Sequence, residues 1–175
     1  VMQRLQVEVR GDLVLLARAH HVEGVAPHSR RHAEVARALD GLGQEVDLPA
    51  GQTTQMVVGA AEESDREIFD RLLFEYDVMD LRRVYFSVFT PVAGTAFEDR
   101  EKEESWREHR LYQVDWLRRV YRLDEKEIFM AFGDDGFLQN RDPKVAIATE
   151  LFDSPIDPNS ASFSELIRVP GIGPK

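Results

Sequence analysis

Two short apolar segments with a capped segment between them place the strongest constraint on the fold. The first covers residues 55–59 (Gln-Met-Val-Val-Gly) and the second covers residues 83–89 (Arg-Val-Tyr-Phe-Ser-Val-Phe). About 28 residues separate equivalent points of the two segments, which is the size of a βαβ unit. The spacing predicts two parallel strands joined by a helix, and therefore an α/β fold.

The segment between the two strands has the signature of a helix start. Ser64 and Glu67 stand three residues apart and form a capping box, in which each side chain satisfies a free backbone donor of the other. An apolar face then recurs at helical spacing, and we expect the helix to end near Asp80. The residues of this face are Ile68, Phe69, Leu72, Leu73 and Tyr76.

Composition narrows the classes of protein and of partner. The 175 residues are 43% hydrophobic and 31% charged, contain no run of apolar residues long enough to span a bilayer, and begin with a segment interrupted by charges. We therefore expect a cytoplasmic protein with no membrane partner. The formal net charge of −10 opposes sequence-blind attraction to a polyanion, so any contact with nucleic acid must be local. Without cysteine, these residues supply no disulfide and no thiolate ligand.

Residues 106–122 form the longest predicted helix, which has an apolar side and a polar-aromatic side. Leu111, Val114, Leu117 and Tyr121 make an apolar side. Polar and aromatic residues project from the other side, at 100° per residue. Either the helix is packed between two layers, or the polar-aromatic side lines a substrate channel. The residues of this second side are His109, Tyr112, Gln113 and Trp116.

The C-terminal part of the sequence is predicted to be helical and to end in a glycine turn. Asp142 caps a helix that has Pro143 at its first position and residues 145–151 as its body, and residues 157–160 are predicted to cap a final helix. The glycines of the following turn, residues 169–173 (Val-Pro-Gly-Ile-Gly), expose backbone N–H groups that suit a phosphate oxygen.

This turn resembles the hairpin of the helix-hairpin-helix motif of DNA-repair proteins. A plain tight turn is the alternative. Because the return helix of such a motif is not in the sequence, we expect this chain to be a fragment. The predicted contacts with the DNA backbone are Pro170, Gly171, Ile172, Gly173 and the charge of Lys175.

Several segments together resemble one family. In order along the chain they are residues 49–61, 86–95, 107–117, 142–144 and 166–175. They are similar to radical S-adenosylmethionine (radical SAM) proteins of DNA modification or repair that pair with a uracil-DNA-glycosylase-like partner. The resemblance covers residues 49–175.

The resemblance implies the C-terminal part of a radical SAM partial (β/α) barrel, followed by an all-α segment ending in half a helix-hairpin-helix. Residues 1–48 are then an uncertain barrel remnant, residues 49–135 the later strands and helices of the barrel, and residues 136–175 the helical segment. The full-length parent is expected to hold S-adenosylmethionine and a [4Fe–4S] cluster. The cluster-binding Cys-x3-Cys-x2-Cys loop of the family is absent here, so the chain is not catalytically complete.

The resemblance also implies ligand contacts, although it assigns no catalytic residue and no metal ligand within this chain. S-adenosylmethionine is expected against Gln55, Val58, Gly59, Val88, Phe89 and Thr90. Substrate is expected near Gln52, Thr53 and Thr54 and near the polar-aromatic side of the 106–122 helix. Hydroxyl and amide groups orient a ligand without acid–base chemistry, which suits an enzyme whose cofactor performs the reaction. Hydrogen bonding at the strand end is the alternative role of residues 52–55.

Two functions remain open. The first is a fragment of a radical SAM enzyme of DNA or RNA modification, in which a 5′-deoxyadenosyl radical abstracts hydrogen from a substrate held near nucleic acid. The second is a non-catalytic nucleic-acid adaptor, or a gene remnant, that keeps the hairpin without the cluster. An adaptor needs no cysteine triad upstream, which distinguishes the two.

Overall fold

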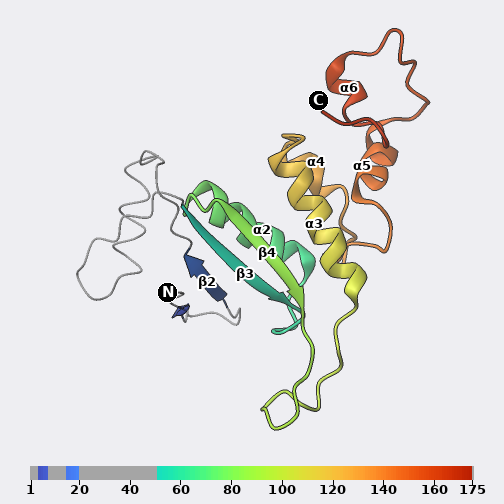
Figure 1. Ribbon diagram of the computed structural model, residues 1–175. Helices are drawn as coiled ribbons and strands as arrows, with labels where there is room; N and C mark the ends of the chain where they lie inside the picture. The colour runs from blue at the N-terminus through green and yellow to red at the C-terminus, as the bar shows by residue number, and fades with distance from the viewer. Residues whose placement is uncertain (1–3, 8–14, 20–50, 175) are drawn as a thin grey trace. The chain divides into compact units, whose positions relative to one another are not determined.

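The computed structural model describes residues 4–7, 15–19 and 51–174. Within them the chain is mixed α/β (Figure 1). The elements are β1 (Arg4–Val7), β2 (Leu15–Ala19), β3 (Gln52–Val58), α2 (Asp65–Asp77), β4 (Arg83–Val88), α3 (Ser105–Arg119), α4 (Glu125–Phe129), α5 (Pro143–Leu151) and α6 (Phe163–Leu166).

The chain divides into two compact units. The first comprises Val1–Glu63 and Asp70–Lys102, and the second comprises Ser64–Phe69 and Glu103–Lys175. The start of α2 therefore belongs to the second unit. This division falls before α3. The sequence boundaries at residues 48/49 and 135/136 stay a prediction.

The first unit contains the predicted βαβ unit. β3 and β4 pair in parallel, from Thr53 opposite Arg83 to Val58 opposite Val88, which confirms the parallel pair and the helix between its strands. Alternate residues of β3 are buried, as a strand with one covered face requires. Tyr76 of α2 ties the helix to β4, because its hydroxyl accepts a hydrogen bond from the Val84 N–H at 3.0 Å.

The other two described strands extend the sheet on the β3 side. β2 pairs antiparallel with β3, and β1 pairs antiparallel with β2, so the strand order is β1-β2-β3-β4. Within the described sheet, β3 and β4 are thus the one parallel pair.

The second unit is built from helices around a small apolar core. Leu111, Val114 and Leu117 of α3 are buried, as are Ile128 of α4 and Ile147 of α5.

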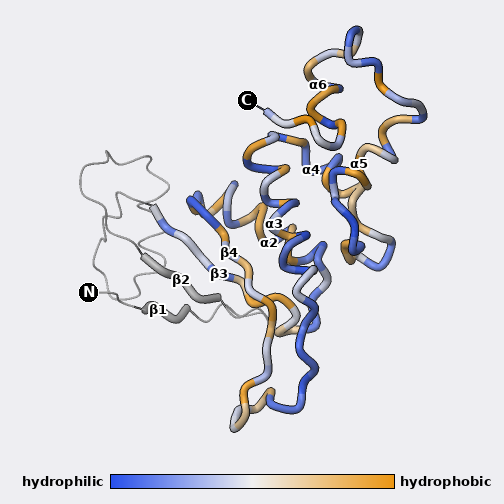
Figure 2. The backbone as a smooth tube through the Cα atoms, turned by 45° about the vertical axis from the view of Figure 1, so that its right-hand side comes forward, coloured by the Kyte–Doolittle hydropathy of each residue, from blue (hydrophilic) through white to orange (hydrophobic). Residues whose placement is uncertain are grey.

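Figure 2 shows a continuous hydrophilic run along the chain just before α3, where the sequence is rich in acids. The predicted helix is confirmed with bounds Ser105–Arg119, three residues shorter at its C-terminal end than expected.

Local capping signals account for most helix starts. The capping box of α2 is confirmed: Ser64 N–H donates to Glu67 Oε2 at 2.8 Å, and Glu67 N–H donates to Ser64 Oγ at 3.2 Å. Asp142 caps α5 as predicted, accepting from Lys144 N–H at 2.8 Å with Pro143 in the first turn.

The predicted cap of the last helix was wrong. α6 is capped by Ser162, which shares a capping box with Glu165, and not by residues 157–160. Asp157 instead accepts from the Asn159 N–H two residues on, at 2.9 Å. This short-range bond is typical of aspartate in a turn, where it competes with helix capping.

Among the described residues, no helix combines the length and the apolar character needed to cross a membrane.

Candidate functional site

The glycine turn of the second unit is a tight backbone turn. Ile172 N–H donates to the Val169 carbonyl at 3.1 Å, with Pro170 and Gly171 between them. Gly171 has φ +86°, a conformation that favours glycine, so proline followed by glycine marks a type II turn. The sequence therefore determines this turn locally.

The turn presents two backbone donors to solvent. Gly171 and Gly173 are both exposed. Their N–H groups have no hydrogen-bond acceptor among residues 51–174. Two such N–H groups, one on either side of the bonded Ile172 N–H, suit an anion such as a phosphate oxygen. Lys175, the predicted charge beside them, lies outside the described residues.

The segment that carries the turn is attached to the second unit by an ion pair. Arg168 binds Glu127 of α4 with two parallel bonds, Nε to Oε1 at 2.6 Å and Nη2 to Oε2 at 2.8 Å. Such a bidentate pair fixes geometry as well as charge. The guanidinium next to the turn is therefore neutralised, which leaves the backbone dipoles as the attraction that the described part of the turn offers to an anion.

The predicted cofactor residues meet at the carboxyl end of the parallel strands. Val58 lies opposite Val88, and Phe89 N–H donates to the Val58 carbonyl at 2.8 Å. Gly59 follows directly, and Thr90 is exposed. The carboxyl edge is where ligands bind in open α/β sheets. The structure thus brings five of the six residues together, with Gln55 further back along β3.

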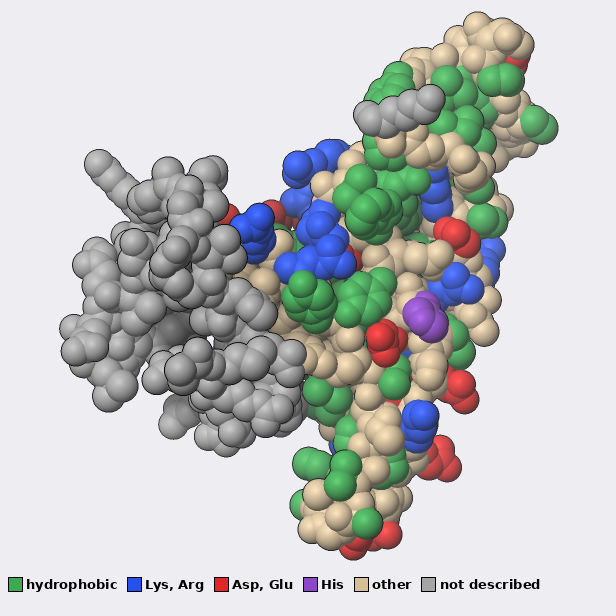
Figure 3. Space-filling view, viewed as in Figure 1, with side chains coloured by type: hydrophobic (Ala, Val, Ile, Leu, Met, Phe, Trp, Pro, Cys, Tyr) green, Lys and Arg blue, Asp and Glu red, His purple; other side chains and the backbone are tan. Residues whose placement is uncertain are grey.

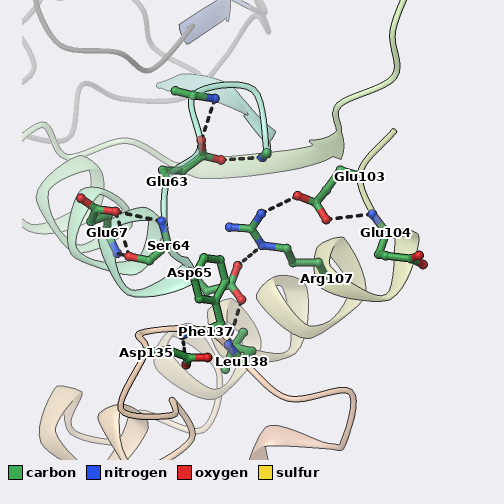
Figure 4. A network of polar contacts seen from close by, with 12 residues as sticks. Glu63, Ser64, Asp65, Glu67, Glu103, Glu104, Arg107, Asp135, Phe137 and Leu138 are labelled. Carbon is green, nitrogen blue, oxygen red and sulfur yellow. Dashed lines mark hydrogen bonds and ion pairs between the residues drawn. The ribbon is translucent and has the colours of Figure 1, made fainter. Parts of the chain in front are cut away.

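A glutamate that the sequence analysis did not identify accepts hydrogen bonds from the backbone N–H groups at this edge. Glu63 is buried, and its carboxylate accepts from Gly59 N–H at 2.5 Å and from Ala61 N–H at 2.8 Å (Figure 4). Its signal in the sequence is an acid four residues after the glycine that ends a strand. The N–H of Gly59, a residue predicted to contact S-adenosylmethionine, is therefore already bonded within the chain.

The predicted substrate residues of β3 lie at the other end of the strand. Gln52, Thr53 and Thr54 begin β3, and the Gln52 carbonyl accepts from Arg82 N–H at 2.8 Å. Gln55 donates from Nε2 to Ser87 Oγ on β4 at 2.9 Å. The alternative role of residues 52–55 was hydrogen bonding at the strand end; the Gln52 bond lies there, whereas the Gln55 bond crosses to the neighbouring strand in mid-strand.

The predicted polar-aromatic side of α3 lies in the second unit. His109 and Trp116 are exposed, while Tyr112 and Gln113 are half-buried. Gln113 is engaged within the unit, since its Oε1 accepts from Arg110 Nη1 at 2.7 Å and its Nε2 donates to Asp142 Oδ2 at 3.3 Å. The two exposed side chains are the ones accessible to a ligand.

A buried ion pair organises the second unit, and sequence reasoning did not find it. Arg107 Nε donates to Asp65 Oδ1 at 2.6 Å, and Leu138 N–H donates to Asp65 Oδ2 at 2.8 Å (Figure 4). Glu103 Oε2 accepts a further bond from Arg107 Nη1 at 2.6 Å. Burial raises the pKa of the Asp65 carboxyl, and the charge of Arg107 and the Leu138 N–H oppose that shift. The network joins the start of α2, α3 and the loop before α5.

No group of three potential metal ligands occurs among the described residues. Comparison with protein-family models, with curated proteins and with solved structures gave no match.

Proposed function

We propose that this chain binds the sugar-phosphate backbone of nucleic acid through the turn at residues 169–173, as the C-terminal part of a radical SAM protein of DNA or RNA modification. The observation that carries the proposal is the pair of exposed donors at Gly171 and Gly173, which have no acceptor among residues 51–174. Contacts of this kind hold the backbone in position without reading its sequence.

The enzymatic part of the proposal rests on the resemblance and on the parallel βαβ unit, which a partial (β/α) barrel requires. The side chains present do not fit a [4Fe–4S] cluster, since none of the 175 residues is a cysteine. We therefore derive no reaction step for this chain. The residues near the carboxyl ends of β3 and β4 are the proposed contacts with S-adenosylmethionine, and a uracil-DNA-glycosylase-like protein is the proposed partner.

Substitution of Gly171 tests nucleic-acid binding. Gly171→Ala places a methyl group at φ +86° with no described atom within 4 Å of it, so the change strains the turn and crowds the outer face without clashing inside. We expect its affinity for a fluorescein-labelled DNA duplex to fall about tenfold in fluorescence anisotropy, because a hydrogen bond to a charged group contributes about 1.5–3 kcal/mol.

Gly94→Ala is the matched control. Gly94 has φ +79°, and a methyl group there would likewise have no described atom within 4 Å, but this glycine lies in the first unit, outside the turn. The affinity of the control should stay within about twofold of wild type. Equal losses in both variants, or no binding by the wild type, would refute the nucleic-acid function.

The gene on both sides of this segment distinguishes the enzyme from the adaptor. A continuous reading frame with Cys-x3-Cys-x2-Cys upstream supports the radical SAM enzyme. Its product, reconstituted with iron and sulfide without oxygen and given S-adenosylmethionine and a one-electron reductant, should form 5′-deoxyadenosine. Stop codons on both sides would instead favour the adaptor or gene remnant.

A further inference from the structure

Lys144 is a buried lysine to which the proposed function assigns no role. It is the second residue of α5, and its residue surface is only 6% exposed. Lysine is almost never buried to this extent without a partner, because removing the ammonium from water is costly. Burial accordingly lowers the pKa of the Lys144 amine, against the opposing charge of Asp142.

The partners of the Lys144 ammonium are an aromatic ring and a carbonyl of the glycine turn. Nζ lies 4.4 Å from the centre of the Tyr121 ring, a distance at which a cation is attracted by the face of the ring. Nζ also donates a hydrogen bond to the Ile172 carbonyl. No carboxylate lies within ion-pair distance of this ammonium in the part of the chain that the structure describes. The Lys144 ammonium is therefore engaged by groups of the protein itself, the Tyr121 ring and the Ile172 carbonyl.

Tyr121 also contacts the turn directly, and the contact explains the second glycine. A methyl group at Gly173 would lie 3.1 Å from Tyr121 Oη and 3.8 Å from Cζ. Gly173 does not have the left-handed φ of Gly171, so its backbone conformation does not require glycine. The lack of a side chain is what permits the close approach to Tyr121. The two glycines thus have different roles: Gly171 allows the turn, and Gly173 lets it approach Tyr121.

We infer that Lys144 and Tyr121 are positioning residues that anchor the turn at residues 169–173 by its Ile172 carbonyl and so hold it in the conformation in which Gly171 and Gly173 are exposed. The inference rests on the proposed function for its purpose, since the anchored donors are the ones proposed to bind phosphate. Figure 3 shows hydrophobic side chains exposed on the segment that carries α6. Exposed side chains of this segment include Phe163, at 69%, and Ile172, at 38%.

A lysine beside a proposed phosphate site would ordinarily be taken as a phosphate contact. Burial of Lys144 and its bond to the Ile172 carbonyl argue against that role. The two roles differ in salt dependence: removal of a phosphate-contacting lysine reduces the salt slope of binding by about one, whereas removal of a positioning residue leaves the slope unchanged.

Two measurements on the same variants test the inference. The amide signals of Gly171 and Gly173 in ¹H–¹⁵N spectra report the turn itself, and anisotropy titrations with a fluorescein-labelled DNA duplex over a range of NaCl concentrations report affinity and salt slope. Lys144→Met should displace both amide signals and lower affinity about tenfold with an unchanged salt slope. Lys126→Met, which removes an exposed lysine of α4, is the matched control and should leave both amide signals in place.

Tyr121 supplies a second pair of variants in case Lys144→Met does not fold. Tyr121→Phe keeps the ring under the ammonium and should retain the wild-type Gly171 amide signal and affinity, whereas the Gly173 signal, next to the lost hydroxyl, is not used for this variant. Tyr121→Leu removes the ring and should displace the signals as Lys144→Met does.

Each outcome decides one part of the proposal. Unmoved Gly171 and Gly173 signals in both Lys144→Met and Tyr121→Leu would overturn the inference, as would a salt slope reduced by about one in Lys144→Met. Displaced signals together with a wild type that does not bind DNA would refute the proposed function and leave the anchor supported as a structural feature.

Discussion

Asp65 and Lys144 bury charge in two different ways. Asp65 is fully buried and matched by Arg107, with the Leu138 N–H on its second oxygen. Lys144 is matched by a ring and a carbonyl instead. A paired carboxylate stabilises the fold only while its partner remains, because either charge left alone in the interior is costly. The sequence shows neither pairing, since each joins residues far apart along the chain.

Asp65→Asn should destabilise the protein by about 3 kcal/mol, the low end for removing one partner of a buried ion pair. The low end applies because Glu103 still accepts from Arg107 in the variant. Urea unfolding followed by circular dichroism measures the loss. Asp134→Asn, an exposed aspartate in the loop before α5, is the control and should change stability by less than about 0.5 kcal/mol. Similar values for the two variants would show that the buried pair contributes little.

At the scale of elements, the loop at residues 133–138 docks on the first turn of α2 within the second unit. Arg66 N–H donates to the Gly136 carbonyl at 2.9 Å, and the Arg66 guanidinium lies 3.5 Å from the centre of the Phe129 ring. Gly136 has φ +80°, and a methyl group there would lie 3.3 Å from Ser64 Cβ. Both the backbone conformation and the close approach therefore require glycine.

Gly136→Ala should destabilise the protein by about 1–3 kcal/mol, and by more than Gly94→Ala. Gly94 has a similar φ and open space around it, so the two variants share the backbone strain and differ in the contact with α2. Thermal unfolding of both variants gives the comparison. Equal losses would mean that Ser64 and Arg66 move aside freely.

At the scale of the whole molecule, net charge bears on the proposed binding of nucleic acid. The formal net charge is −10, and beside the turn Arg168 is paired with Glu127 and Lys144 is buried, so neither of these two cations is available to displace counterions from DNA. In the proposed complex, backbone dipoles would carry most of the attraction at the turn, and we expect the affinity for DNA to be weak at physiological salt.

The logarithm of the DNA association constant should fall with the logarithm of NaCl concentration with a slope no steeper than about −2, because one or two phosphates are contacted. Anisotropy titrations of the wild type measure this slope. A slope near about −6 would indicate a broad basic surface, which the proposal excludes.

The sequence by itself determined the features that depend on neighbouring residues. The βαβ unit, the starts of α2 and α5 and the turn at Gly171 follow from hydrophobic spacing, capping side chains and a proline-glycine pair. The start of α6 could not be predicted in this way. Asp157 and Ser162 are both residue types that cap helices, and in the structure Ser162 caps α6 while Asp157 accepts from Asn159 N–H.

Only the tertiary structure decided which groups face one another across the chain. Asp65 meets Leu138 across 73 residues, and Lys144 meets Ile172 across 28. Such pairs form when packing closes long loops, and the sequence around either partner carries no sign of the other. For the same reason only the structure showed that the Glu63 carboxylate accepts a hydrogen bond from Gly59 N–H. It also showed that the Gly171 and Gly173 N–H groups have no acceptor among the described residues.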